Sequence, residues 1–440
     1  MKNLTSVLIA TMTAGNLFAD VSVEDIKCTQ RYPWNGLVDI EYTIACDDPD
    51  AEIYVNPVGF NGDTGLTVFP THFTGDGATN AVKAGKHTMV WDAKADLGNT
   101  FATKNFQIKM YAGKKLSRYI VIDISGGTNA TSYAVRHSIE GPNLADDTCR
   151  TTEIWMRLIL PGTFMMGSPK DELGRYDNED LHKVTITKPY YIGVFEVTQR
   201  QWELVYGKNP SYFASSINYA TRPVESMNIS QLRGCNSSCY PSSTGVAGDS
   251  FIGKLRSKTS NGRFDLPSQV QHEYACRAGA VTALYDGSNL SSSTSSENLN
   301  RLARYYYNGN NGQTIIGSTM DLGTAKVGSY EPNRLGLYDM LGNVYELCRD
   351  YYEEHLGTYP VVNPKISGGY VIDSSTYNGT GSYTVKWKMT GMGGGSWKGT
   401  ARGCRSARRV SYDMAYAESY VVRYRSWEDL GFRLCAEADF

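Results

Sequence analysis

The chain has 440 residues, of which 41% are apolar, and its formal net charge at pH 7 is −2. This length predicts about two to three domains with buried cores. The balanced charge excludes a strong electrostatic attraction to nucleic acid or to an anionic membrane surface, so neither is expected as a partner. The 31 tyrosines suit a surface that binds sugars or peptides, although all-β folds also use many aromatic residues.

Residues 1–19 have the pattern of a secretory signal. Lys2 gives a basic start, residues 7–14 form a short apolar run, and Ala19 stands before the expected cleavage point. No later stretch approaches the ~18 apolar residues that a membrane-spanning helix needs. We therefore expect a secreted, periplasmic or cell-surface protein without a membrane span.

The nine cysteines fit an oxidising compartment, and their odd number leaves at least one without a partner in the chain. Cys235 and Cys239 are spaced for a small disulfide loop or for half of a zinc site. Zinc is the poorer interpretation, because no second Cys or His pair lies nearby at metal-ligand spacing. The six histidines are scattered and form no HxxxH or HExxH pattern.

Residues 20–113 are predicted to form an all-β domain. Apolar and polar residues alternate over 38–45 and 106–110, and 88–91 is a shorter candidate strand. Turns rich in Gly and Asp separate these runs, which is typical of a small sandwich of immunoglobulin type. Cys28 and Cys46 are a candidate disulfide inside it. Nothing in the domain resembles a catalytic set, so its expected role is spacing or adhesion.

Residues 114–152 are expected to be a connector, although 119–122 are strand-like, and residues 153–440 are expected to form an α+β domain with much irregular structure. Two helices are predicted in it, one over 199–206 after the N-cap Thr198 and one over 269–276 after the N-cap Ser268. Two loops are also expected: an exposed one over 286–299, rich in Ser and Asn, and a long one over 366–395 with room for one hairpin.

The stretch Leu335–Cys348 is an apolar run that is interrupted at Gly342-Asn343. Gly and Asn tolerate positive φ, so this pair predicts a tight turn. The side-chain oxygens of Asn343 and Glu346, with the Val344 carbonyl between them, suit a hard cation such as calcium. From these residues alone, a capped turn with a hydrogen-bonded Asn is the simpler interpretation.

An ordered series of motifs runs through the C-terminal two-thirds of the chain. The motifs are Gly162–Ser168 (GTFMMGS), Glu196–Gln199 (EVTQ), Asn209–Phe213 (NPSYF), Pro223–Glu225 (PVE), Leu266–Ser268 (LPS), His272–Gly279 (HEYACRAG), Gly336–Glu346 (GLYDMLGNVYE), Gly394–Trp397 (GGSW) and Gly431–Leu434 (GFRL). Over roughly residues 153–436 the series resembles the formylglycine-generating enzyme, or sulfatase-modifying factor, family. The resemblance implies a variant of the C-type lectin fold and a structural calcium, which we expect at Asn343, Val344 and Glu346.

The resemblance also implies Cu(I) held by two thiolates after the GGS-aromatic motif, because two soft sulfur ligands bind Cu(I) well. In the family's pattern the first cysteine follows the Ser by three residues and the second by eight. Those positions here are Gly399 and Cys404, so the first ligand is missing, and the segment that follows Ser396 is also shorter than in the enzymes. Copper is therefore not expected, and Cys404 and Ser396 are catalytic candidates only if the protein is active.

The sequence around Cys404 better resembles a structural segment of the family, which implies a disulfide between Cys276 and Cys404. A lone reactive thiol at Cys404 is the lesser alternative. The iron-dependent sulfoxide synthases of this fold require a histidine triad from a separate helical domain, and this sequence contains no such domain or spacing.

In the family, the region that corresponds to residues 410–430 lines the substrate groove. The candidate ligand-binding residues are Trp397, Tyr412, Tyr416, Tyr420, Arg423, Tyr424 and Trp427. We expect a secreted, non-catalytic protein that binds a peptide or a glycan through this face. Two alternatives are a divergent oxidase that uses Cys404 with another ligand such as Cys435, and a structural surface-assembly component or hypervariable lectin-fold binder.

Overall fold

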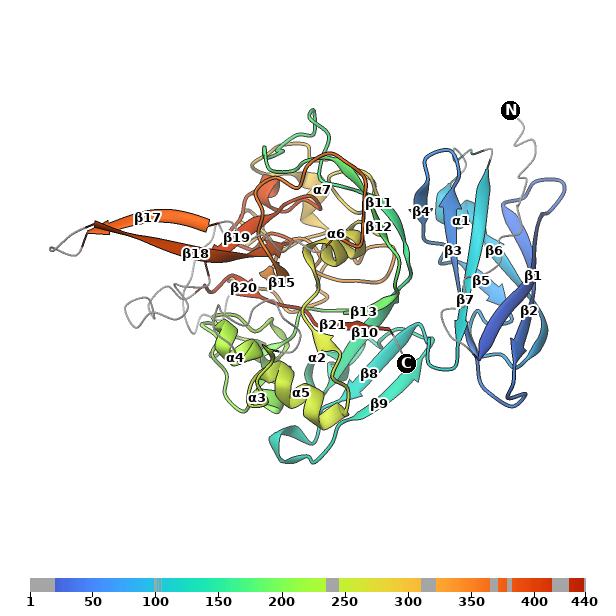
Figure 1. The fold of residues 1–440 in the computed structure, drawn as a ribbon, viewed down its shortest axis with the longest axis horizontal. Coiled ribbons are helices and arrows are strands. Elements are labelled where there is room, and N and C mark those ends of the chain that lie inside the picture. The colour runs from blue at the N-terminus through green and yellow to red at the C-terminus, as the bar shows by residue number, and fades with distance from the viewer. Residues whose placement is uncertain are drawn as a thin grey trace.

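The computed structural model describes residues 20–98, 101, 103, 105–234, 245–309, 322–364, 371–377, 382–413 and 427–438, with the backbone alone at 371–377, 382–390 and 412–413. A β-rich N-terminal module lies beside a larger C-terminal domain (Figure 1). Within these ranges, none of the helices combines the length and the apolar character needed to cross a bilayer.

The N-terminal module consists of two antiparallel sheets. The first sheet has the order β1 (Val21–Gln30), β2 (Leu37–Cys46), β6 (Gly85–Asp92) and β5 (Phe73–Gly75), and the second has the order β4 (Leu66–Val68), β3 (Tyr54–Asn61) and β7 (Phe106–Gly113). Alternate residues of β2, among them Ile40 and Ile44, are buried in a core with residues of β7 such as Ile108 and Met110. The predicted strands are confirmed, and the assignment to the immunoglobulin type stays a prediction.

The candidate disulfide between Cys28 and Cys46 is wrong. Cys28 lies opposite Ile40 and Cys46 lies opposite Val21 in the β1–β2 pair. Ile40 and Cys46 are six positions apart on β2, which is about 20 Å at the rise of a strand. The Cα atoms of a disulfide lie less than about 7 Å apart.

The C-terminal domain contains three further sheets. The largest has the antiparallel order β14 (Phe264–Asp265), β21 (Cys435–Glu437), β13 (Tyr190–Gly193), β10 (Glu153–Ile159), β8 (Tyr119–Asp123) and β9 (Ala134–Ser138). The second sheet has the order β11 (Gly162–Met166), β12 (His182–Ile186) and β16 (Val361–Val362). The third sheet has the order β17 (Val371–Tyr377), β18 (Ser382–Gly393), β15 (Tyr345–Tyr351) and β20 (Leu430–Gly431). Strand β19 (Val410–Asp413) also pairs with β18. The third sheet carries the motif turns of the candidate site, because β15 follows the Gly342-Asn343 turn and β18 ends at the Gly-Gly-Ser-Trp motif.

Residues 119–138 differ from the expected connector, because β8 and β9 extend the largest sheet beside β10. Ile120, Val121 and Ile122 are fully buried, so the short apolar run is a core strand. The β17–β18 hairpin confirms the one expected within 366–395, and it projects from the body of the domain (Figure 1). The expected exposed loop at 286–299 is only partly so, because Leu290 and Ser296 are buried.

The described residues form seven short α-helices. They are α1 (Ala93–Leu97), α2 (Thr148–Thr151), α3 (Gln199–Tyr206), α4 (Ile229–Arg233), α5 (Phe251–Thr259), α6 (Gln269–Arg277) and α7 (Glu297–Asn300). Helices α3 and α6 confirm the two predicted helices, and each begins with a capping box, at Thr198 and at Ser268. Helix α5 was not expected from its weak apolar pattern. Packing stabilises it, since the Phe251 ring stacks on Trp202 with a centroid distance of 4.9 Å.

The two bodies share buried surface. Val58 and Phe69 of the N-terminal module belong to the hydrophobic core of the C-terminal domain. Polar contacts accompany this packing, including a 2.6 Å hydrogen bond from the Thr163 amide to Thr67 Oγ1. The modules are therefore joined by a packed interface as well as by the chain.

Candidate functional site

The glycine pair of the Gly-Gly-Ser-Trp motif turns the chain where β18 ends. Gly394 and Gly395 both have a φ of +85°, which favours glycine. A Cβ on Gly395 would lie 2.5 Å from the carbonyl oxygen of Gly403 and 2.8 Å from Cys404 Sγ. Glycine is required at position 395 because the turn presses directly against the segment that carries Cys404.

The Ser and Trp of the motif are both fully buried. Ser396 Oγ donates a hydrogen bond to Asp429 Oδ2 at 2.8 Å, and Trp397 Nε1 donates to the Glu428 carbonyl at 3.0 Å. The Trp397 ring also meets Phe213 edge-on at 5.6 Å. The expectation that Trp397 binds a ligand is therefore wrong for this structure, because core packing leaves its ring no surface to offer.

Cys404 is a single buried thiol. Its Sγ donates to the Ser396 carbonyl at 3.7 Å, and burial raises the pKa of the thiol to about 12. A Cβ built on Gly399 would lie 3.8 Å from this sulfur. The position that carries the first copper cysteine in the family's pattern is thus next to Cys404 in space, and it is glycine. The other candidate ligand, Cys435, lies on β21, where its thiol contacts Gln271 Oε1 at 3.9 Å.

The turn before β15 has the predicted conformation. Gly342 and Asn343 have φ values of +76° and +56°. The Asn343 amide nitrogen donates to Glu196 Oε2 at 2.6 Å, and its Oδ1 accepts from the Ala325 amide at 2.8 Å. The Val344 amide donates to the other oxygen of Glu196 at 3.1 Å. Asn343 is therefore a hydrogen-bonded residue of a buried turn.

Glu346 forms the centre of a buried charge cluster. Its Oε1 and Oε2 each lie 2.6 Å from a nitrogen of the Arg433 guanidinium, and His272 Nε2 lies 3.0 Å from Oε2. Burial alone would raise the pKa of this carboxyl, but the charges of Arg433 and His272 lower it to about 2. The cluster joins α6, β15 and the chain between β20 and β21.

The geometry of Asn343, Val344 and Glu346 does not fit a calcium ion. The Glu346 oxygens face a guanidinium and an imidazole, and the Asn343 oxygen faces a backbone amide. A calcium ion needs six to eight oxygen ligands. Over the described ranges, no group of three or more His, Cys, Asp or Glu side chains is arranged to hold a metal. We therefore do not propose calcium at these residues.

Cys276 and Cys404 are separate thiols in the structure. Cys276 Sγ donates to the Met340 carbonyl at 3.6 Å, whereas Cys404 donates to Ser396. Burial raises the pKa of the Cys276 thiol to about 12. The expected bond between them is not made here, and their pairing in oxidised protein stays a prediction.

Arginines on both sides of Cys404 in the chain cluster around Tyr176, which was not expected. The guanidinium carbons of Arg402 and Arg408 lie 3.9 and 3.7 Å from the centroid of the Tyr176 ring. Arg405 is fully buried and forms a bidentate pair with Glu179, at 2.9 and 2.6 Å. These contacts fix the segment that carries Cys404 against the rest of the domain. The repeated arginines of this segment were the only signal in the sequence.

The predicted ligand-binding face is only partly described. Tyr416, Tyr420, Arg423 and Tyr424 lie outside the described residues, and Tyr412 has only its backbone, on β19. Trp427 is half-buried and packs on the main core.

Residues near the Gly399 turn supply aromatic and cationic groups that the sequence did not single out. The Tyr306 amide donates to the Gly399 carbonyl at 2.9 Å, which holds the tyrosine run 305–307 beside the turn. Tyr307 is 44% exposed. Lys398 Nζ lies 5.3 Å from the centroid of the Trp397 ring and pairs with Glu428 at 2.5 Å.

Residues 142–438 match the family model described as the sulfatase-modifying factor enzyme 1-like domain. The chain belongs to this family. The resemblance found from the motif series is thereby confirmed.

Individual relatives cover smaller parts of this sulfatase-modifying-factor-like chain. It is 29% identical over 231 residues to a protein named chaperone protein LppX from Paenibacillus barcinonensis, a match that covers 46% of this chain and 76% of that protein. It is 31% identical over 103 residues to the formylglycine-generating enzyme of Mus musculus, which covers 23% of this chain and 26% of the enzyme. The chain thus spans about a quarter of that enzyme's length.

Two solved structures were also found to be similar. Treponema denticola variable protein 1 is 24% identical with a TM-score of 0.44, and the match covers 65% of this chain and 96% of that one. PvdO from Pseudomonas aeruginosa is 22% identical with a TM-score of 0.43, and the match covers 64% and 94%.

Proposed function

We propose that this protein is a secreted, non-catalytic member of the sulfatase-modifying factor family that binds a peptide or glycan through its C-terminal face. The observation that carries the proposal is the single buried thiol of Cys404 beside Gly399. A thiol with a pKa of about 12 keeps its proton at neutral pH. The family's first copper position, residue 399, is glycine, so Cys404 has no second sulfur there with which to bind a soft metal. This arrangement supports binding in place of oxidation.

From the described residues, the proposed binding face takes Tyr307, Lys398 and Trp427. The predicted ligand-binding residues that are proposed to complete it are Tyr412, Tyr416, Tyr420, Arg423 and Tyr424. Exposed rings stack on sugars or on extended peptides, and lysine or arginine beside them adds charge-assisted hydrogen bonds. Tyr307 follows Tyr306, whose amide donates to the Gly399 carbonyl, and Lys398 directly precedes Gly399 in the chain. The relative named a chaperone protein supports a peptide over a glycan.

The test is binding of the full chain to peptide and glycan arrays, followed by affinity measurements on the best ligand. Tyr307→Ala, Tyr420→Ala and Trp427→Ala are expected to weaken binding about tenfold or more each, as aromatic hot-spot residues do. Tyr359→Ala is the matched control, because Tyr359 is an 82% exposed tyrosine between β15 and β16. Because Trp427 packs on the core, the melting temperature of the Trp427→Ala variant is measured alongside its affinity.

Binding that survives all three substitutions, or that is lost equally in Tyr359→Ala, would contradict the proposed face. The proposal of secretion has its own readout: the N-terminal sequence of protein recovered from culture medium or periplasm is expected to begin at Asp20. Retention of Met1 in that fraction would refute cleavage.

A further inference from the structure

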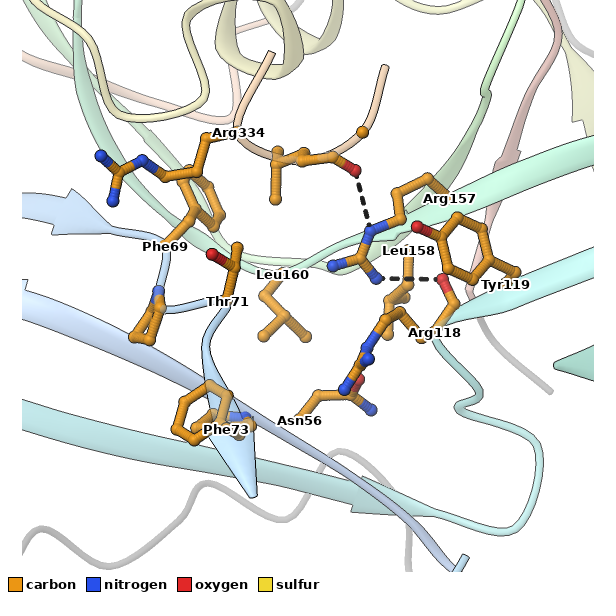
Figure 2. A pocket seen from close by; sticks show the side chains of 14 residues that line it. Asn56, Phe69, Thr71, Phe73, Arg118, Tyr119, Arg157, Leu158, Leu160 and Arg334 are labelled. Atoms are coloured by element: carbon orange, nitrogen blue, oxygen red, sulfur yellow. Dashed lines mark hydrogen bonds between the residues drawn. The ribbon is translucent and has the colours of Figure 1, made fainter. Parts of the chain in front are cut away.

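Among the described cavities, the one between the two modules has the largest excess of positive side chains, because Arg118, Arg157 and Arg334 line it and no Asp or Glu does. A cavity of about 230 Å³ opens there, lined by β3 and the chain around β5 on one side and by β10, the start of β8 and residues 334–336 on the other. Figure 2 shows Arg118 and Arg157 together at one side of this cavity and Arg334 across from them, above Phe69.

Backbone oxygens position the first two guanidinium groups. Arg157 donates from Nε to the Leu335 carbonyl at 3.2 Å and from Nη1 to the Arg118 carbonyl at 3.1 Å, as the dashed lines in Figure 2 mark. Its guanidinium also lies over the Tyr119 ring at 5.0 Å. Arg118 donates from Nη2 to the Ala78 carbonyl at 3.1 Å. Both side chains are thus held in place by groups that carry no net charge.

Neither of these two arginines forms an ion pair with any carboxylate in the described part of the chain, and Nη2 of Arg157 makes no hydrogen bond there. Burial, with a smaller contribution from the charge of Arg118, lowers the pKa of Arg157 to about 10. Both groups still carry a full positive charge at neutral pH. Partly buried arginines of this kind ordinarily have an anionic partner.

The acid beside Arg334, Asp96, is already engaged by other donors. The Asp96 carboxylate accepts from the Thr71 amide and hydroxyl, from Trp91 Nε1 at 2.7 Å and from His72. Its Oδ1 lies 3.8 Å from Arg334 Nη1. Asp96 therefore balances the Arg334 side of the cavity and leaves the Arg118–Arg157 side positive.

The rest of the lining is mixed. Asn56 and Thr71 contribute polar groups, and Phe69, Phe73, Leu158 and Leu160 contribute apolar surface. Phe69 and Phe73 lie on the side of the cavity away from Arg118 and Arg157 (Figure 2). Its volume is below the ~300–1,000 Å³ of drug-sized sites, so the occupant is small. A ligand that suits both features has an oxyanion at one end, for the donors left on the two guanidinium groups, and a compact apolar body at the other.

We propose that the junction between the modules is a binding site for a small organic oxyanion, with the carboxylate or phosphate held by Arg118 and Arg157 and the apolar body against Phe69 and Phe73. Nothing in the proposed peptide or glycan binding uses this cavity. A bound anion would also strengthen the contact between the modules, since it touches residues of both.

The experiment is calorimetric titration of the full chain with benzoate and phenyl phosphate, beside inorganic phosphate and neutral benzamide. Benzoate or phenyl phosphate is expected to bind more tightly than inorganic phosphate, and benzamide is not expected to bind. Arg118→Gln and Arg157→Gln are each expected to weaken binding about tenfold to a hundredfold, as the loss of a charge-assisted hydrogen bond does.

Arg136→Gln is the control, because Arg136 is an exposed arginine paired with Glu153 outside the cavity. Arg157→Gln also removes two hydrogen bonds to the backbone, so Arg118→Gln, which removes one, decides the result if the first variant is unstable. Benzoate and phenyl phosphate that bind no better than benzamide would overturn the proposal. So would unchanged affinity in Arg118→Gln.

Discussion

The strongest test of the lone-thiol argument is to restore the second sulfur with Gly399→Cys. Gly399 has no positive φ, and the three atoms nearest to its Cβ would be the Ser396 carbonyl oxygen at 3.3 Å and the Ser396 amide nitrogen and Cys404 Sγ, both at 3.8 Å. The neighbours need to yield by a few tenths of an ångström, which costs about 1 kcal/mol. The variant is therefore expected to fold, with its new sulfur one bond beyond that Cβ and within reach of Cys404.

The expected gain is a copper site. In the native chain, ionising a thiol with a pKa of about 12 at pH 7 costs about 7 kcal/mol, and a single sulfur–metal bond has to offset it. Two adjacent thiolates share a Cu(I) ion, which prefers soft sulfur ligands. We expect Gly399→Cys to retain one copper per chain and the native protein to retain none.

The assay is anaerobic Cu(I) titration against a chromophoric competitor, followed by metal analysis after desalting. Gly399→Ser is the matched control, since it has nearly the same size and no sulfur, and Gly399→Cys combined with Cys404→Ala tests the pair. One tightly bound copper in the native protein that Cys404→Ala abolishes would refute the reasoning and return the oxidase hypothesis. Absence of copper in a folded Gly399→Cys variant would refute the geometry.

Gly395→Ala is expected to destabilise the fold by more than ~2 kcal/mol in denaturant unfolding, because its φ is +85° and its Cβ would lie 2.5 Å from the Gly403 carbonyl oxygen. The control Gly399→Ala should cost less than ~1 kcal/mol. Equal effects of the two substitutions would contradict the close packing of the Gly394-Gly395 turn. Glu346→Gln is expected to cost about 3–5 kcal/mol at pH 7, because it leaves the buried Arg433 without its charge partner. The folded-state pKa of Glu346, about 2, lies below its ordinary 4.5, so its stabilisation is present above pH 4.5 and is lost as the pH falls toward 2. The difference between Glu346→Gln and the native protein should therefore shrink over that interval, and a constant difference would rule out the ionised pair. A strong chelator is expected to leave the melting temperature unchanged, because the Asn343 and Glu346 oxygens already accept from protein donors; a drop of several degrees would show that a cation is bound.

The sequence predicted the elements that local rules determine. The N-cap residues Thr198 and Ser268 predicted α3 and α6, and the alternation along 38–45 predicted β2. The pair Gly342-Asn343 predicted a turn with positive φ. In each case the signal lies within a few residues of the element that it specifies.

The elements that were missed depend on distant partners. Helix α5 has a weak pattern and is held by the stacking of Phe251 on Trp202. The residues of β8 and β9 were expected to be part of a connector, because these strands are stabilised by pairing beside β10, a contact that no local pattern shows. Likewise, no spacing in the sequence shows that Glu346 faces Arg433, 87 positions later. Sequence patterns therefore predict the local conformation of a residue better than they predict which distant residue it contacts in the folded chain.

The contacts of the motif residues explain why the family was recognisable while the chemistry was not. Asn343 binds Glu196, and Glu346 binds both His272 and Arg433, so four separate motifs meet through buried polar contacts. Glu273 likewise accepts from the amide of Gly167, and Glu225 accepts from the amides of Tyr212 and Phe213. A buried polar group left without its hydrogen-bond partner costs about 1–3 kcal/mol, and a buried charge left without its partner costs more, so each of these residues constrains the others.

That group specifies a scaffold. Gly399 takes no part in these side-chain contacts. Its backbone forms hydrogen bonds with the Ser396 carbonyl and the Tyr306 amide, and the neighbours of a Cβ there need to shift by only a few tenths of an ångström for a cysteine. A sulfur at that position can therefore be present or absent without disturbing the motif contacts. It follows that a match to this family's motifs is evidence for the fold, and that the two positions 399 and 404 have to be inspected separately before oxidase activity is assigned to any chain that carries them.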